Sequence, residues 1–328
     1  MTVTTDDEES QMQDEKDSLD RSLTGLDMAG WKAGLADMAN AEGMFEDLGD
    51  RHFATFIERD NTLLVTFETV QGIRTLSDRD QPLGFDMVRA QDWSHLCLIS
   101  DGDTWFRDPV LYEFFDRLID DGFFETYHRI VFYGAGPCGY AAAAFSVAAP
   151  GAIVLAVQPQ ATLDPRMTEW DPRFTEMRRV SFTDRFGFAP DMIDAAERAF
   201  VFYDPCEPCD AMHAALFRRP NVSRMRMAHM GDTLQTRLIE MGILYQLLLL
   251  AGTGRLTELA FARLYRARRD HAAYLRNLMA HLDAADRPYL NALLCRSVTE
   301  RMNAPRLHRR LNALRAAANT GAFRFPPE

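Results

Sequence analysis

The chain has 328 residues, of which 47% are hydrophobic, and a formal net charge of −12. This length suffices for one large α/β domain with an appendage, or for two domains. No run reaches the roughly 18–20 apolar residues of a membrane span, the acidic N-terminus is unlike a secretory signal, and five cysteines do not suggest a disulfide framework. We therefore expect a cytoplasmic protein with no membrane partner.

The predicted elements begin after an acidic tail. Residues 1–20 contain eight acidic residues and one Lys, so residues 1–25 are predicted to be disordered. Residues 26–57 give weak, Met-rich helical patterns, and residues 110–119 show the spacing of an amphipathic helix. Short apolar segments predict strands at residues 63–67, 96–99, 130–133, 152–157, 199–203 and 222–227.

These strands are apolar on both faces, and helical stretches separate most of them, which is typical of a parallel sheet covered on both sides. The chain reads as helical from about residue 233 to about residue 318. The sequence therefore predicts an α/β core over residues 26–232 and a helical C-terminal extension, residues 233–328, packed on that core.

Charge is distributed unevenly along the chain. Residues 218–328 hold 19 of the 36 basic residues and 8 of the 48 acidic ones, so this segment carries +11 and the rest −23. We interpret the basic residues as solvated helix faces, with an anionic ligand or an acidic partner as the alternative. No aromatic–basic pattern or zinc-finger spacing supports binding of nucleic acid.

The most informative segment, residues 129–144, reads as a buried strand, a tight glycine turn and an Ala-rich helix. Gly134, Gly136 and Gly139 satisfy G-x-G-x-x-G, which predicts an FAD or NAD site. The next strand of such a site ends in an acidic residue that binds the ribose, but here it ends at Gln158, and the turn lies in mid-chain. The other interpretation is a nucleophile elbow, a strained turn that presents a reactive side chain.

The elbow interpretation accounts for more of the chain. In an α/β-hydrolase the nucleophile, the acid and the histidine follow in that order, after successive strands. Asp204 follows the strand that ends at residue 203, and His229 follows the strand that ends near residue 227. Both order and spacing fit.

Residues 60–245 resemble the α/β-hydrolase superfamily, most closely bacterial members whose elbow reads Tyr-Gly-Ser-Ser-Met-Gly-Gly-Tyr-Ala-Ala. The residues that agree are Tyr133, Gly134, Gly139, Tyr140, Ala141 and Ala142. The resemblance implies an α/β-hydrolase-like fold with a mostly parallel central sheet, with Asp204 as acid and His229 as base. The nucleophilic Ser falls on Gly136, which has no side chain, and the Gly two positions later falls on Cys138.

Three explanations of the missing serine remain open. In the first, the protein is a degenerate hydrolase that binds a ligand or partner without acyl transfer. In the second, Cys138 is the nucleophile, activated by the helix N-terminus and assisted by His229 and Asp204. In the third, His229 and Asp204 activate water directly. Pro137, which follows the nucleophile position, lacks the N–H that an oxyanion hole needs there. Ordinary ester hydrolysis is therefore not expected.

Further candidate residues follow the other strands. Cys206 and Cys209 form a C-x-x-C which, with Cys138 and His229, predicts a zinc site as a minor alternative. Asp210 is an alternative acid on the same loop as Asp204. We expect a set of residues to line the pocket or its oxyanion region: Gly134, Gly136, Gly139, Phe67, Glu68, Asp103, Trp105 and Gln158.

Overall fold

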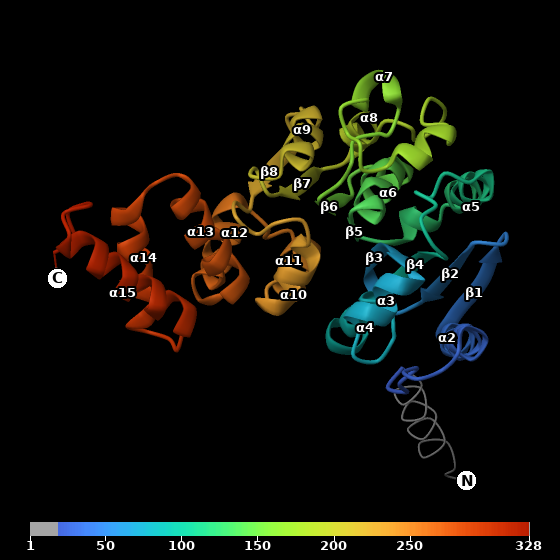
Figure 1. The fold of residues 1–328 in the computed structure, drawn as a ribbon. Helices are drawn as coiled ribbons and strands as arrows, with labels where there is room; N and C mark the ends of the chain where they lie inside the picture. Colours follow the sequence, from blue (N-terminus) through green and yellow to red (C-terminus); the bar gives the residue numbers. More distant parts are fainter. Residues whose placement is uncertain (1–18, 328) are drawn as a thin grey trace, which may run out of the picture.

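The computed structural model describes residues 19–327 (Figure 1). Its centre is one eight-stranded sheet with the strand order β1-β2-β4-β3-β5-β6-β7-β8. The strands are β1 (Gly43–Leu48), β2 (His52–Ile57), β3 (Asp60–Thr69), β4 (Trp93–Ser100), β5 (Arg129–Ala135), β6 (Ile153–Val157), β7 (Arg198–Tyr203) and β8 (Val222–Arg226).

Strand β2 runs antiparallel to both β1 and β4, and all other neighbours are parallel. The six predicted strands correspond to β3–β8, and the predicted fold class is confirmed. Because parallel strands all end at one edge, the loops after β5, β7 and β8 meet there, and this edge holds the candidate site.

The prediction for residues 26–57 was only partly right. Helix α2 (Met28–Glu42) is present, but residues 43–57 form the β1–β2 hairpin instead of helix. Strand β1 is mostly half-exposed, so its side chains do not show the apolar run by which the other strands were recognised. Gly49, at φ 72°, lies in the turn of the hairpin, where the left-handed region favours glycine.

Helices cover both faces of the sheet (Figure 1). One face packs on α5, α6 and α8; the other packs on α2–α4 toward β2 and on α10–α12 toward β8. The helices are α3 (Val70–Leu76), α4 (Gly84–Gln91), α5 (Pro109–Asp120), α6 (Pro137–Phe145), α7 (Pro165–Thr168), α8 (Ala189–Met192), α9 (Pro208–Leu216), α10 (Leu234–Glu240), α11 (Leu244–Gly252), α12 (Glu258–Leu264), α13 (Ala272–Ala284), α14 (Pro288–Thr299) and α15 (Pro305–Asn319).

The helices after residue 233 form two sets. Helices α10–α12 share a core with the sheet, whereas α13–α15 enclose a separate small core around Leu275, Cys295 and Leu311. Figure 1 shows α14 and α15 extending away from the sheet. Among the described helices none alone has the length and hydropathy to cross a membrane. Helices α10 and α11 have that length and hydropathy only when taken together, and the pair is bent by 93°.

The predicted acidic tail lies mostly outside the described residues, which begin at Leu19. Leu19 and Leu23 are buried against α2 and Ile73 of α3. The part of the tail from residue 19 onward therefore belongs to the folded chain.

Candidate functional site

The turn between β5 and α6 has the backbone of a nucleophile elbow. Gly136 lies between the last strand residue and the first helical residue, at φ 58° and ψ −125°. Its N–H donates to the Val157 carbonyl (2.8 Å), and its own carbonyl accepts from the Tyr140 N–H (3.0 Å). A Cβ placed on Gly136 would meet no atom within 4 Å. The turn thus keeps open space where a nucleophile would stand.

The other two glycines of the motif are explained by close packing. A Cβ on Gly134 would lie 2.1 Å from the Cys138 carbonyl oxygen, and one on Gly139 would lie 2.9 Å from the Val157 carbonyl oxygen. Both positions let α6 approach β5 and β6 closely, as the strand–turn–helix geometry requires. The G-x-G-x-x-G pattern therefore needs no bound dinucleotide to account for it.

Cys138 lies in the first turn of α6 but is not activated there. Its side chain is buried, and burial, reinforced by the nearby Glu68 and Asp103 carboxylates, raises the pKa of the thiol well above its usual range. The expected lowering by the helix N-terminus is outweighed, because desolvation disfavours the thiolate more strongly.

Alkylation of the native protein should therefore discriminate between cysteines. We expect iodoacetamide to modify the exposed Cys206 first and Cys138 only after unfolding, because the latter thiol is buried and protonated. Peptide mapping of a time course in buffer and in urea measures this. If native Cys138 were modified as fast as Cys206, Cys138 would not be the buried and protonated thiol described above.

Asp204, after β7, is fully buried and bound to backbone. Its carboxylate accepts hydrogen bonds from the N–H groups of Cys206 (2.8 Å), Gly231 (2.8 Å) and His229 (3.2 Å). These contacts tie the loop after β7 to the loop after β8. The carboxylate thus holds the loop carrying His229, whereas a catalytic acid would bind the imidazole ring.

The His229 ring faces the C-terminal helices. Its Nδ1 lies 3.4 Å from Cys206 Sγ, and its centroid lies 4.6 Å from that of His281 on α13. Burial, and then the neighbouring His281, lower the pKa of His229. Its carbonyl accepts from Asn277 Nδ2 (3.0 Å), which anchors α13 to the loop.

The predicted zinc set is not assembled. Cys206 and His229 are in contact, but among the described residues the one group of three or more His, Cys, Asp or Glu side chains close enough to share a metal is Glu68, His95 and Cys97. Cys138 and Cys209 therefore do not join the Cys206–His229 pair. His95 and Cys97 were not recognised in the sequence, although both interrupt an otherwise apolar strand.

Asp210 and Gln158 belong to a polar network at the same edge of the sheet. Gln158 Nε2 donates to Asp210 Oδ2 (2.7 Å), and its Oε1 accepts from the Leu234 N–H (2.7 Å). Asp210 also accepts from Arg173 (2.7 Å). Both residues are therefore engaged by neighbouring protein groups.

Arg173 extends this network to a buried acid–histidine pair. It also binds Asp171 (2.8 Å), which lies 3.0 Å from His213 Nε2. The Ala161 N–H donates to His213 Nδ1 (3.1 Å), so Nε2 carries the proton that binds Asp171. Burial alone would raise the pKa of the Asp171 carboxyl, but hydrogen bonds from His213 and Arg173 outweigh it and hold the pKa well below its usual range.

The Asp171 pair predicts a pH dependence of stability. A carboxyl whose folded-state pKa is depressed stabilises the fold fully above its unfolded pKa near 3.8, and this contribution is lost as the pH falls below that value. We expect Asp171→Asn to cost about 1.5–3 kcal/mol at pH 7 and progressively less at lower pH. Urea unfolding at a series of pH values measures the difference in unfolding free energy between wild type and Asp171→Asn. A difference that did not change with pH would contradict the stabilising role of the Asp171 carboxylate.

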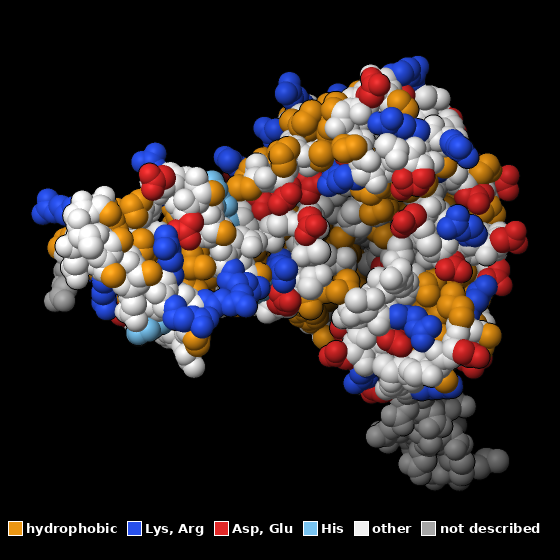
Figure 2. Space-filling view, viewed as in Figure 1, with side chains coloured by type: hydrophobic (Ala, Val, Ile, Leu, Met, Phe, Trp, Pro, Cys, Tyr) orange, Lys and Arg blue, Asp and Glu red, His pale blue; other side chains and the backbone are white. Residues whose placement is uncertain are grey.

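A pocket of about 550 Å³ opens beside the elbow. Its lining includes Ala135, Pro137 and Cys138 of the turn, with Glu68 and Asp103 next to them. Helices α3, α4, α10 and α11 form the walls, and Figure 2 shows the surface hollowed between these parts of the molecule.

The predicted pocket residues divide accordingly. Phe67, Glu68 and Asp103 line the pocket, whereas Gly134, Gly136, Gly139, Trp105 and Gln158 do not. The Trp105 ring is buried against Tyr140, Phe174 and Phe182, as part of the core. The lining also includes neither Asp204 nor His229, so the predicted acid and base lie outside this cavity.

The sequence matches no protein-family model and no curated protein. Among solved structures it is similar to the capsule O-acetyltransferase of Neisseria meningitidis serogroup A in complex with CoA, at 9% identity, over 61% of this chain and 94% of that one, with a TM-score of 0.39. The thermostable carboxylesterase EstE1 from a metagenomic library gives 11% identity, 81% and 99% coverage and a TM-score of 0.39. A chain of the Streptococcus agalactiae glycosylation-associated Gap123 complex is 13% identical, over 65% of this chain and 47% of that one, with a TM-score of 0.44.

The fold is evident from the topology itself. The sheet is mostly parallel, its antiparallel strands lie at the β1 end, and helices cover both faces. The elbow follows β5, Asp204 follows β7 and His229 follows β8, in the order that the superfamily requires. The chain therefore has an α/β-hydrolase fold.

Proposed function

We propose that this protein is a non-catalytic member of the α/β-hydrolase type, a pseudoenzyme that binds a small molecule in the pocket beside its degenerate elbow. The observation that carries the proposal is Gly136, which leaves the nucleophile position without a reactive atom while the turn around it is kept. Pro137 supports it, because the residue after the nucleophile position has no N–H to stabilise an oxyanion.

The lining of the pocket indicates the chemistry of the ligand. The lining is mixed, and its aliphatic part comes mainly from α3, α10 and α11, including Ile73, Ile239 and Leu248. The carboxylates of Glu68 and Asp103 lie at the elbow end. This arrangement suits a ligand with an apolar body and one polar group that donates hydrogen bonds, such as an alkylamine.

The two guanidinium groups at the pocket do not oppose such a ligand. Arg79 is paired with Asp20 (2.9 Å), and Arg89 is paired with Asp86. Their charges are therefore already balanced by protein carboxylates, and an anionic ligand gains little from them.

Binding of a dansylated alkylamine tests the proposal. We expect its fluorescence to rise and saturate with wild-type protein, and to do so far less with Ile239→Trp, which fills the pocket. Leu259→Trp, on an exposed position of α12, is the matched control and should bind like wild type. A dansylated fatty acid of equal length should bind more weakly. Equal binding by both Trp variants would contradict the use of this pocket.

The thiol-dependent acyl hydrolase or transferase is the second candidate, and Cys138 favours it because this residue lines the pocket. It requires His229 to reach that thiol, yet the ring contacts Cys206 and His281 instead. Turnover of p-nitrophenyl esters that disappears in both Cys138→Ser and His229→Ala would favour it over the binding protein. We expect no turnover above buffer.

We expect neither FAD nor NAD to bind, because the Gln158 side chain that would bind a ribose already bonds Asp210 and the Leu234 N–H. We also expect the protein in the cytoplasm, in keeping with five free cysteines.

A further inference from the structure

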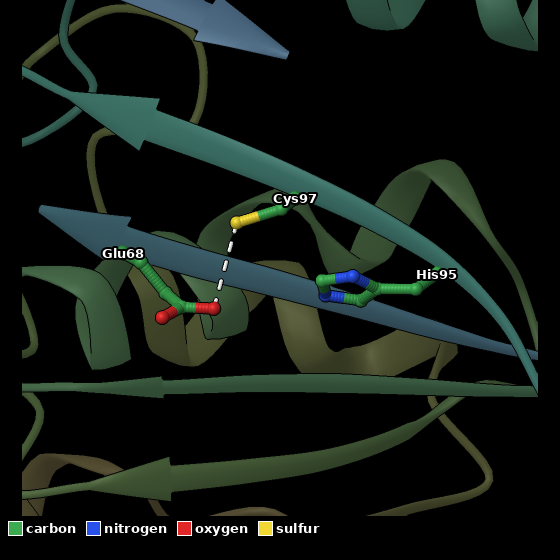
Figure 3. A group of neighbouring side chains, drawn as sticks. All are labelled: Glu68, His95 and Cys97. Atoms are coloured by element: carbon green, nitrogen blue, oxygen red, sulfur yellow. Dashed lines mark hydrogen bonds between the residues drawn. The ribbon is translucent and has the colours of Figure 1, made fainter. Parts of the chain in front are cut away.

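Four polar side chains are buried together between the neighbouring strands β3 and β4. Thr66 of β3 lies opposite Cys97 of β4 in the parallel register. Glu68 follows Thr66 by two residues and His95 precedes Cys97 by two residues, so all four side chains lie on the same face. Figure 3 shows the side chains of Glu68, His95 and Cys97 converging. His95 and Cys97 are fully buried, and Glu68 is 9% exposed where it lines the pocket.

The polar atoms of this cluster are in contact. Thr66 Oγ1 donates to Glu68 Oε1 (2.8 Å) and lies 2.9 Å from His95 Nε2. Cys97 Sγ lies 3.5 Å from the same carboxylate oxygen. One ligand atom each from Glu68, His95 and Cys97 lies within 4.8 Å of the other two. These separations place the three groups around one small volume.

The cluster is not a completed hydrogen-bond network. Within the described part of the chain, His95 Nδ1 is buried without a partner, and so is the hydroxyl of Thr55, which pairs with Cys97 from β2. Buried polar atoms without partners are rare in folded proteins and call for an explanation such as a bound ion or water. The Glu68 carboxylate accepts from Thr66 and from the Leu83 N–H (3.1 Å), so His95 Nδ1 and the Thr55 hydroxyl are the atoms of the cluster that protein hydrogen bonds leave unexplained.

We propose that Glu68, His95 and Cys97 bind a divalent transition metal ion, with zinc the preferred one. One thiolate, one imidazole and one carboxylate form a ligand set that zinc accepts. The two negative ligands balance the charge of the ion, so the occupied site is neutral and suits its buried position. Three protein ligands leave a fourth position for water or a pocket ligand.

Cys97 would bind the ion as the thiolate, so the thiol proton leaves to solvent as sulfur bonds the metal. The pocket at Glu68 provides the entry path.

Cobalt(II) titration of chelator-treated full-length protein tests the site. We expect one equivalent to bind and to produce a thiolate-to-cobalt charge-transfer band, and zinc to displace it. Cys97→Ser should abolish the band, and Glu68→Gln should weaken binding at least about tenfold. Cys295→Ser, another buried cysteine remote from the cluster, is the matched control and should keep band and affinity. Circular dichroism establishes that each variant is folded.

Two outcomes would overturn the proposal. One is the absence of any band from folded wild-type protein. The other is a band that survives Cys97→Ser but is lost in Cys206→Ser, which would place the ion at the exposed Cys206–His229 pair. If Cys97→Ser does not fold, Glu68→Gln, which alters only the pocket-facing ligand, decides the question. The metal site does not depend on the proposed function, since dansyl-amine binding and cobalt binding are measured separately.

Discussion

Gly134→Ala is expected to destabilise the protein by roughly 3 kcal/mol or more, a large part of the roughly 5–15 kcal/mol that typically stabilises a protein of this kind. The added Cβ would lie 2.1 Å from the Cys138 carbonyl oxygen and 2.4 Å from its carbon. Both are backbone atoms of α6, so no side-chain rotation relieves the overlap. The helix would have to move away from β5, and the buried alanines of α6 would lose their contacts with the sheet.

Gly136→Ala is the matched control, two residues along the same turn. Its Cβ would meet no atom within 4 Å, so the cost is the strain of an alanine at φ 58°, about 1–3 kcal/mol. Urea unfolding of both variants, followed by circular dichroism, measures the difference. Equal losses would mean that the glycines serve a common backbone requirement and that close packing of α6 is not what selects Gly134.

Asp204→Ala is expected to cost roughly 3–5 kcal/mol, because it removes a buried acceptor from three backbone N–H groups. The N–H groups of Cys206 and Gly231 are each 2.8 Å from the Asp204 carboxylate, and the N–H group of His229 is 3.2 Å from it. Cavity formation adds to the loss of the hydrogen bonds. The loops after β7 and β8 should loosen together, since this carboxylate joins them.

Asp204→Asn is the control for this prediction, since its amide oxygen retains one acceptor, and we expect a milder loss of about 1–2 kcal/mol. Unfolding free energies of the two variants, with hydrogen exchange at residues 204–231, provide the measurement. A folded and fully stable Asp204→Ala protein would refute the structural role and leave the residue available for chemistry.

The fold was largely predictable from the sequence because it depends on local patterns. Apolar runs identified β3–β8, and the glycine spacing identified the turn at Gly136. The β1–β2 hairpin was missed because its edge strand is half-exposed and lacks such a run. These signals lie within a few residues of one another, so no knowledge of distant contacts was needed to use them.

The site was harder to predict because it depends on distant contacts. Chain order placed His229 after the correct strand, but its ring direction follows from packing against His281 of α13, which no local pattern records. His95 and Glu68 are brought together by the register of β3 on β4. The available signal was the repeated polar residue at every second position of two buried strands, Thr66-x-Glu68 and His95-x-Cys97.

The open space at Gly136 also determines what a side chain introduced there would meet. The Cβ of a serine would contact no atom within 4 Å, so the strain of φ 58° is the cost of placing it. Yet Pro137 would still withhold the oxyanion donor, and the His229 ring would still face α13. A serine introduced at position 136 alone would therefore stand without a backbone donor at the next residue and without the His229 ring beside it.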